Sequence, residues 1–133
     1  VLALVLVLVF TSGSSSSNTG SITGNAVSGN SVNAVSQPDV TFEVSAFNFR
    51  FFLDGVESPE LKVKQGDKVR IIFNNEEGFH DLVVDELNVR TQQIEAGSSQ
   101  TIDFVANKKG IFEYYCSVGR HRANGMYGKF IVE

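Results

Sequence analysis

From residue 40 onward, apolar and polar side chains alternate along several short stretches of the chain. The alternation is clearest in residues 40–47, 68–73, 100–105 and 110–116. Strict alternation predicts a β-strand with one face buried and the other in contact with solvent. These stretches are therefore expected to form the framework of the folded part.

Shorter apolar stretches between them predict further strands. These stretches are residues 48–53, 61–63, 80–84, 88–94 and 129–132. Runs rich in Gly, Asn, Ser or Asp separate the strands and predict turns, at residues 54–55, 65–67, 74–78, 96–99 and 107–110. About eight strands at even spacing, without a long helical period, indicate an all-β sandwich or barrel with Greek-key connections.

The beginning of the chain has a different composition. Residues 1–10 are all apolar, and no charged residue occurs before Asp39. Such a stretch is typical of the end of a signal peptide or of a membrane anchor, with a buried first strand as the alternative. Residues 11–38 are rich in Ser, Gly and Asn and predict a flexible linker. We therefore expect a folded domain at residues 39–133, located in the periplasm or at the cell surface, which the apolar segment could tether to a membrane.

Charge and cysteine content restrict the function. The formal net charge of −4 gives no support for nucleic-acid binding, which requires a clustered basic face. A single cysteine excludes an internal disulfide, so the core, with or without a metal, must hold the fold. Phenylalanine side chains are expected to fill that core: Phe42, Phe47, Phe49, Phe51, Phe52, Phe73, Phe104, Phe112 and Phe130.

Candidate metal ligands gather in one short segment. Residues 116–126 contain the only cysteine, Cys116, the only methionine, Met126, and one of the two histidines, His121. The other histidine, His80, follows the turn predicted at residues 74–78. Two imidazoles, one thiolate and one weak thioether form the donor set of blue-copper electron-transfer sites.

Each of these residues also has an ordinary structural interpretation. A free cysteine is often a small buried side chain, Met126 could fill the core, and His80 could be a polar residue at the start of a strand. Together, however, they form one pattern in which a distant histidine joins three ligands on one loop. A sandwich that fixes both ends of this loop would keep the ligands rigid in either oxidation state of the metal.

Residues 40–133 resemble the cupredoxins, the superfamily of plastocyanin and azurin. The resemblance rests on the segment EYYCSVGRHRANGM and on the Phe–His pair upstream, with ligand spacings similar to those of auracyanin. It implies an eight-stranded Greek-key sandwich that holds one type 1 copper ion. The implied equatorial ligands are His80, Cys116 and His121, and the implied axial ligand is Met126.

One residue departs from the family pattern. Many cupredoxins have asparagine after the first histidine ligand, whereas this chain has Asp81. Its backbone N–H could still donate to the cysteine sulfur, and its side chain could bond Ser117 across the two ligand segments. An ionised carboxylate at this position should favour Cu(II) and lower the reduction potential. Redox titration of Asp81→Asn is therefore expected to give a higher potential.

The resemblance implies a one-electron carrier that cycles between Cu(II) and Cu(I), and not an enzyme. Multicopper oxidases and copper nitrite reductases need additional histidines, and the binuclear copper site of cytochrome oxidase needs a second cysteine. Protein redox donors and acceptors would dock near His121, where Arg120 and Arg122 would form a basic rim. The carrier is expected to be a monomer.

Three alternatives stay open at this point. The protein could store or deliver copper, or it could be a metal-free interaction module. In a third variant, a carboxylate from Asp81 or a neighbouring glutamate could replace Met126 in a red-copper site. An electron carrier should hold copper in both oxidation states, whereas a delivery protein should release Cu(I) to an acceptor.

Overall fold

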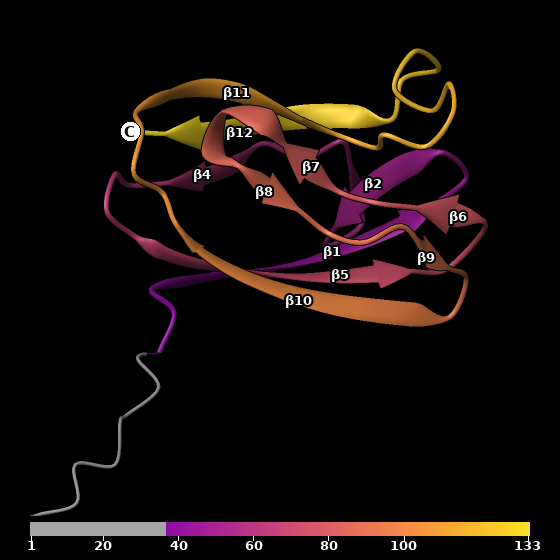
Figure 1. Ribbon diagram of the computed structural model, residues 1–133, viewed down its shortest axis with the longest axis horizontal. Coiled ribbons are helices and arrows are strands. Elements are labelled where there is room, and N and C mark those ends of the chain that lie inside the picture. Colours follow the sequence, from indigo (N-terminus) through magenta and orange to yellow (C-terminus); the bar gives the residue numbers. More distant parts are fainter. Residues whose placement is uncertain (1–36) are drawn as a thin grey trace, which may run out of the picture. The chain divides into compact units, whose positions relative to one another are not determined.

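The computed structural model describes residues 37–133, which form two five-stranded sheets (Figure 1). In spatial order, the first sheet contains β10 (Ser98–Val105), β5 (Lys68–Asn75), β1 (Val40–Phe47), β2 (Arg50–Leu53) and β3 (Val56–Glu57). The second contains β4 (Leu61–Val63), β12 (Tyr127–Val132), β11 (Gly110–Tyr115), β7 (Val83–Val84) and β8 (Val89–Arg90). A separate two-stranded ladder pairs β6 (Phe79–His80) with β9 (Ile94–Glu95), and a short 3₁₀ turn, η1 (Asp85–Leu87), joins β7 to β8.

The predicted all-β sandwich is confirmed, but its strands are more numerous and shorter than expected. Within the described residues there are twelve strand segments instead of about eight. The strand predicted at residues 80–84 is divided into β6 and β7, and the extended piece predicted at residues 88–94 is divided into β8 and β9. Both divisions have the same cause. β6 and β9 pair with each other, whereas β7 and β8 belong to the sheet of β11, so the chain changes its pairing partner between β6 and β7 and again between β8 and β9.

Two predicted turns are shorter than expected. Asn74 and Asn75 belong to β5, and Ser98 and Ser99 belong to β10, because these four residues pair with one another across the sheet. Asn74 and Asn75 also pair with β1 on their other side. A ladder satisfies backbone donors and acceptors whatever the side chains are, so polar residues that suggest a turn can continue a strand.

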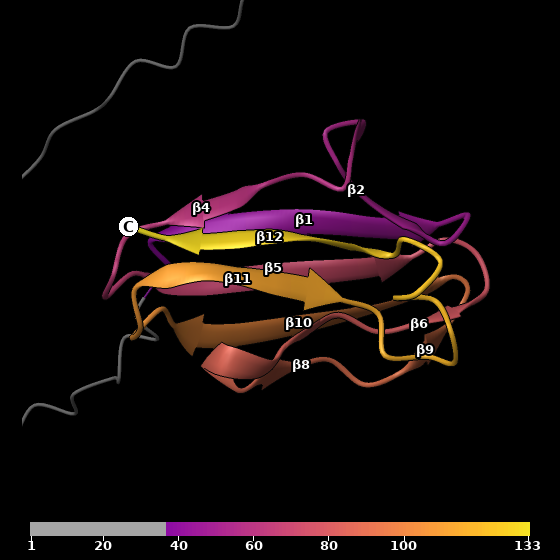
Figure 2. The ribbon, with the colours of Figure 1, turned by 90° about the horizontal axis from the view of Figure 1, so that it is seen from above.

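Aromatic side chains join the two sheets across the core. Phe42 of β1 and Phe104 of β10 both contact Phe130 of β12, with ring centroids 6.4 and 5.8 Å apart. Phe51 of β2 lies 5.2 Å from the ring of Tyr114 in β11. The two sheets are seen as separate layers in Figure 1 and lie one over the other in Figure 2, and apolar side chains from both sheets hold them together.

Three predicted core residues lie elsewhere. Phe47 and Phe52 are half-buried and stack on each other outside the core, with ring centroids 4.3 Å apart. Phe49 is 48% exposed and lies between β1 and β2 instead of inside the sandwich. The two strands are joined by a two-residue turn, Asn48–Phe49, in which both residues have positive φ. This turn directs Phe49 out of the sheet, and continuing the apolar pattern of the strand across the turn gave the wrong prediction.

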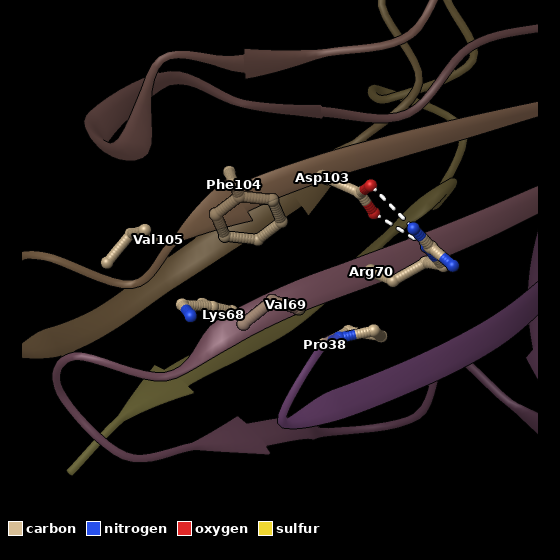
Figure 3. A pocket seen from close by; sticks show the side chains of 7 residues that line it. All are labelled: Pro38, Lys68, Val69, Arg70, Asp103, Phe104 and Val105. Atoms are coloured by element: carbon tan, nitrogen blue, oxygen red, sulfur yellow. Dashed lines mark hydrogen bonds and ion pairs between the residues drawn. The ribbon is translucent and has the colours of Figure 1, made fainter. Parts of the chain in front are cut away.

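A surface hollow of about 310 Å³ lies where β5 begins and β10 ends (Figure 3). Arg70 and Asp103 pair along its rim, with Nε and Oδ1 2.7 Å apart. This pairing lowers the pKa of Asp103. None of the predicted ligands lines the hollow, and His80 follows the opposite end of β5.

The predicted signal or anchor segment, residues 1–10, and nearly all of the predicted linker, residues 11–38, lie outside the described residues. Within residues 37–133, no helix has the length and apolar character needed to cross a membrane. The boundary of the folded domain at residue 39 and the membrane tether therefore stay predictions.

Candidate metal centre

The position of His80 is set by the short connection that follows β5. The buried side chain of Asn75 donates to the carbonyl oxygens of Gly78 (3.0 Å) and Ile94 (2.8 Å), which ties the connection to β9. A Cβ at Gly78 would lie 3.2 Å from Nε2 of His80, and φ at this residue is +78°. Glycine therefore suits both the positive φ of the turn and the close approach of the imidazole.

The other three candidate ligands lie on the loop between β11 and β12. Cys116 follows β11 directly, and its N–H donates to the carbonyl of Met126 (3.1 Å), which closes the loop at its base. The N–H of Met126 donates in turn to the carbonyl of His121 (3.0 Å). The predicted orientation of Cys116 toward the core is confirmed, because its side chain is fully buried, as is that of Tyr114.

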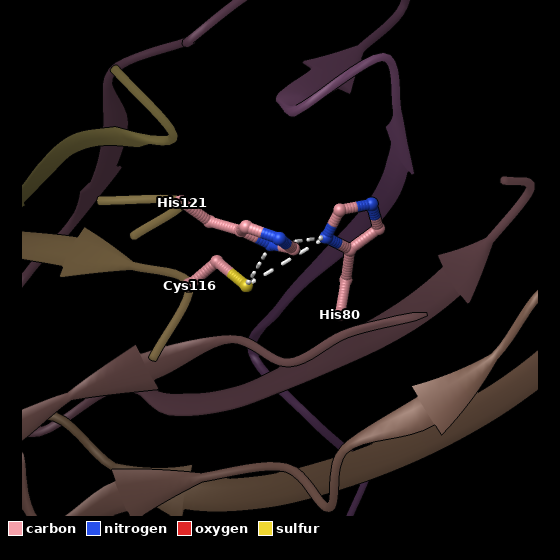
Figure 4. A group of neighbouring side chains, drawn as sticks. All are labelled: His80, Cys116 and His121. Atoms are coloured by element: carbon pink, nitrogen blue, oxygen red, sulfur yellow. Dashed lines mark hydrogen bonds between the residues drawn. The ribbon is translucent and has the colours of Figure 1, made fainter. Parts of the chain in front are cut away.

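Three of the four predicted ligands converge on one point (Figure 4). The Sγ of Cys116 lies 3.7 Å from Nδ1 of His80 and 3.4 Å from Nδ1 of His121, and the two Nδ1 atoms are 3.1 Å apart. All three ligand atoms lie within 4.8 Å of one another, and no carboxylate belongs to the group. Two imidazole nitrogens and one thiolate, without an oxygen ligand, fit copper.

Met126 is also fully buried at this end of the sandwich. Its backbone bonds to Cys116 and His121 place it within the same closed loop. A buried thioether on the same loop as two strong ligands is suited to a weak, long bond to the metal. Its role as the axial ligand nevertheless stays a proposal.

Burial changes the proton affinity of two of the candidate ligands. It is the largest cause that lowers the pKa of His80, and the neighbouring His121 lowers it further. A neutral imidazole keeps a lone pair available for a metal. Burial also raises the pKa of the Cys116 thiol from 9.0 to about 11, while the backbone amides of Asp81 and Val118 act in the opposite direction. Copper would therefore have to displace the thiol proton on binding.

The predicted bond between Asp81 and Ser117 is present. The N–H of Ser117 donates to Oδ1 of Asp81 at 2.6 Å, and the Ser117 hydroxyl bonds to Oδ2 of the same carboxylate. Asp81 follows His80 and Ser117 follows Cys116, so these bonds join the two ligand-bearing segments directly behind the cluster. The carboxylate is completely buried.

The β1–β2 hairpin takes part in the site, which was not predicted from the sequence. The ring of Phe49 contacts the imidazole of His121 edge to face, with centroids 4.8 Å apart, and lies 5.9 Å from that of His80. Arg50 donates to the carbonyl of Asn124 (3.1 Å), which fastens the hairpin to the ligand loop. The available signal was the asparagine at residue 48, which tolerates positive φ and so favours a tight turn here.

Only one of the two arginines of the predicted basic rim is without an ion pair within residues 37–133. Arg122 pairs with Glu113, with Nε and Oε1 2.6 Å apart, and its guanidinium lies 4.0 Å above the ring of Tyr115. Arg120 is exposed on the same loop, and His121 is half-buried. Any docking surface here therefore presents one paired and one exposed arginine beside the imidazole.

Comparison with known proteins agrees with this arrangement. The family model described as the cupredoxin-like domain matches residues 1–132. The copper-containing nitrite reductase of Neisseria meningitidis serogroup A is 31% identical over 84 residues, which are 55% of this chain and 22% of the enzyme. The chain thus spans about a fifth of the length of that relative.

Solved structures share the fold at lower identity. Auracyanin from the photosynthetic bacterium Roseiflexus castenholzii superposes with a TM-score of 0.62 at 22% identity, covering 73% of this chain and 99% of auracyanin. Rusticyanin from Thiobacillus ferrooxidans gives a TM-score of 0.61 at 22% identity, covering 73% of this chain and 79% of rusticyanin. The chain belongs to the cupredoxin-like family, and the arrangement of His80, Cys116 and His121 is that of a single type 1 copper site.

Proposed function

We propose that this protein is a one-electron carrier whose copper is held by His80, Cys116, His121 and Met126. The observation that carries the proposal is the convergence of two Nδ1 atoms and one Sγ within 4.8 Å, in a cluster without a carboxylate in which two of the three side chains are buried. Bound copper would supply a one-electron couple between Cu(II) and Cu(I). The structural neighbours auracyanin and rusticyanin support this proposal through the shared fold.

The chain's own contribution is to hold the ligands in one arrangement. His80 is fixed through Asn75 and Gly78, whereas Cys116 and Met126 are fixed by their mutual backbone bond. Ligands that do not move when the charge of the site changes keep the reorganisation energy of electron transfer low. Such a preformed site favours transfer over substrate chemistry.

The route for the electron is proposed to pass through His121. This imidazole is half-buried, whereas His80 and Cys116 are almost completely buried, so it is the ligand nearest to solvent. A protein donor and a protein acceptor would dock over it, beside the exposed Arg120. Complementary charge at such a surface mainly raises the rate of association. We also propose that these partners lie outside the cytoplasm, as expected for an exported domain.

The likeness to nitrite reductase does not lead us to propose an enzyme. It covers 84 residues and 22% of the enzyme's length. Both histidines of the chain are already in the proposed type 1 site. A further catalytic copper would therefore lack imidazole ligands on this chain.

The test is to add Cu(II) to the copper-free chain and to record visible and electron paramagnetic resonance spectra. We expect one copper per chain, an intense blue thiolate band and a narrow copper hyperfine splitting. Cys116→Ser is the matched control and should lack the band. A colourless product, or the spectrum of ordinary tetragonal copper, would contradict the proposal.

A second measurement separates a carrier from a delivery protein. The reduced, copper-loaded chain is mixed with a Cu(I) chelator, and its self-exchange rate is measured separately. Retention of Cu(I) with fast self-exchange supports a carrier. Rapid release of Cu(I) to the chelator would favour copper delivery instead.

A further inference from the structure

We propose that Arg90 is a positioning residue that sets the reduction potential of the copper site by neutralising the Asp81 carboxylate behind Cys116. This inference rests on the proposed function. Arg90 lies in β8, more than halfway exposed, and is not a candidate ligand. It reaches the site through other side chains, which are Asp81 and Ser117 on one side of the cysteine and Asp85 on the other.

The contacts of the Ser117 hydroxyl show in which direction it bonds to Asp81. The Ser117 hydroxyl faces two groups that can only donate to it, Nη1 of Arg90 at 3.2 Å and Nε2 of Gln93 at 3.4 Å. A hydroxyl has one hydrogen and two lone pairs. Both lone pairs are therefore occupied, and the hydroxyl hydrogen is directed to Oδ2 of Asp81.

The second carboxylate oxygen is an acceptor as well. Oδ1 of Asp81 receives the backbone N–H of Ser117 at 2.6 Å. Both oxygens thus accept hydrogen bonds from Ser117, the pattern of an ionised carboxylate. The NH₂ group of an asparagine at residue 81 would face one of two unsuitable groups. One is the Ser117 N–H, which is also a donor, and the other is the Ser117 hydroxyl, which already accepts two hydrogen bonds. The surroundings of residue 81 therefore suit aspartate better than the asparagine common in the family.

A buried carboxylate requires a positive partner. The Asp81 side chain is 1% exposed, and removing a charge from water without a partner is costly. Within residues 37–133, the only cation paired with it is Arg90, whose Nη1 lies 3.7 Å from Oδ2. The pair places the negative charge directly behind the cysteine and the compensating positive charge at the surface.

Arg90 is connected to both neighbours of Cys116. Its Nη2 lies 4.0 Å from Oδ1 of Asp85, and the Tyr115 hydroxyl donates to Oδ2 of Asp85 at 2.8 Å. On the other side of the cysteine, Ser117 bonds to Asp81. Arg90 therefore lies between two carboxylates, each of which holds a residue adjacent to the thiolate ligand.

This arrangement has a consequence for the redox equilibrium. A positive charge beside Asp81 cancels part of the negative field at Cys116. Without it, the uncompensated carboxylate would stabilise Cu(II) relative to Cu(I). Loss of the Arg90 charge should therefore lower the reduction potential, whereas loss of the Asp81 charge should raise it.

The experiment compares Arg90→Gln, Arg90→Lys and Asp81→Asn, alone and as the double variant Asp81→Asn/Arg90→Gln, in the copper-loaded full chain. We expect a lower potential for Arg90→Gln and a value closer to the unaltered chain for Arg90→Lys. Because the fields of the two charges add at the copper, the opposite shifts should cancel in part, and the double variant should return toward the potential of the unaltered chain. Arg70→Gln is the matched control, because it removes the same charge from an ion pair at the other end of β5, and it should leave the potential unchanged.

A second readout uses the copper-free chain. Arg90→Gln should speed hydrogen exchange of the Ser117 amide roughly tenfold, as expected for a loosened hydrogen bond to a charged acceptor, whereas Arg70→Gln should not. Where Arg90→Gln does not fold, Arg90→Met, which also removes the charge, takes its place in each comparison.

The outcomes distinguish the two proposals. If Arg90→Gln and Arg70→Gln have the same reduction potential and keep the blue spectrum, the role of Arg90 is overturned and the proposed function stands. A double variant whose potential does not return toward that of the unaltered chain would also overturn it. A missing blue band in the unaltered chain would overturn the proposed function, while amide exchange of Ser117 would still decide whether Arg90 positions it.

Discussion

Phe49 and Phe51 lie two residues apart on one hairpin but contribute to different regions of the structure. The ring of Phe51 is completely buried and packs against Phe73 and Tyr114, at centroid distances of 6.2 and 5.2 Å. Phe49 is 48% exposed and covers the imidazole of His121. One hairpin thus contributes to both the apolar core and the metal centre.

The two regions are held by different forces. The sandwich interior is stabilised by burial of apolar side chains, which is strong but not directional. The ligand end depends on directional bonds, such as those from Asn75 to Gly78 and from Ser117 to Asp81. A substitution in the sandwich interior should therefore lower stability with little change in the metal site. A substitution at the ligand end should change the metal site with little effect on stability.

The largest effect is expected for Phe51→Ala. Removing a fully buried phenylalanine should lower the free energy of unfolding of the copper-free chain by about 3–5 kcal/mol. Denaturant unfolding measures the loss, and the copper spectrum of the molecules that stay folded should be unchanged. A loss below about 1 kcal/mol, or an altered blue band, would show that the two regions are not separable in this way.

Tyr114→Phe tests a polar contact inside the apolar region. The Tyr114 hydroxyl donates to the carbonyl of Pro59 at 2.7 Å in the core. Removing it leaves a buried acceptor unpaired and should lower the free energy of unfolding by about 1–3 kcal/mol. Tyr127→Phe, at an exposed ring, is the control and should change little. Equal unfolding curves for Tyr114→Phe and the unaltered chain would contradict the prediction.

Copper affinity should depend on pH in a direction set by Cys116. The pKa of the thiol is raised to about 11, so below that pH copper binding must release the thiol proton. Affinity should therefore increase about tenfold, or 1.4 kcal/mol, for each pH unit between neutrality and that pKa. Competition with a chelator at several pH values measures the slope. A flat profile would mean that the thiol does not lose its proton on binding.

The raised pKa of Cys116 also predicts how the stability of the copper-free chain depends on pH. The unfolded thiol loses its proton near its ordinary pKa of 9.0, whereas the folded thiol keeps it up to about 11. Stability from this group is therefore fully present below pH 9.0 and decreases as the pH rises through about 11. Unfolding in denaturant across this range measures the decrease, and Cys116→Ala should remove this part of it.

The smallest effect on stability is expected for Phe49→Ala. Because the ring is largely exposed and the residue has positive φ, the free energy of unfolding should change by no more than about 0.5 kcal/mol. Water would reach His121 more easily, so self-exchange of the copper-loaded chain should become slower. Val56→Ala, an exposed apolar residue in the same sheet, is the control. An unchanged self-exchange rate would show that Phe49 does not shield the site.

The strand framework followed from periodicity because most strands bury one face. Val40–Phe47 and Lys68–Asn75 alternate buried and less buried residues as their sequences suggest. The division of residues 80–84 and 88–94 was not predictable, because it depends on which distant strand each piece meets. The two-residue strand β3 had no pattern long enough to recognise.

The sequence alone determined the donor set of the proposed site, since Cys116, His121 and Met126 share one loop and His80 is the only other histidine. It also suggested the Asp81–Ser117 bond. Only the tertiary structure placed Phe49 over the imidazoles and Arg90 between two carboxylates. The physical reason is that ligand identity is a property of side-chain chemistry, which the sequence states directly. The neighbours of a ligand come from strands far apart in the chain, and packing of the two sheets decides which of them meet.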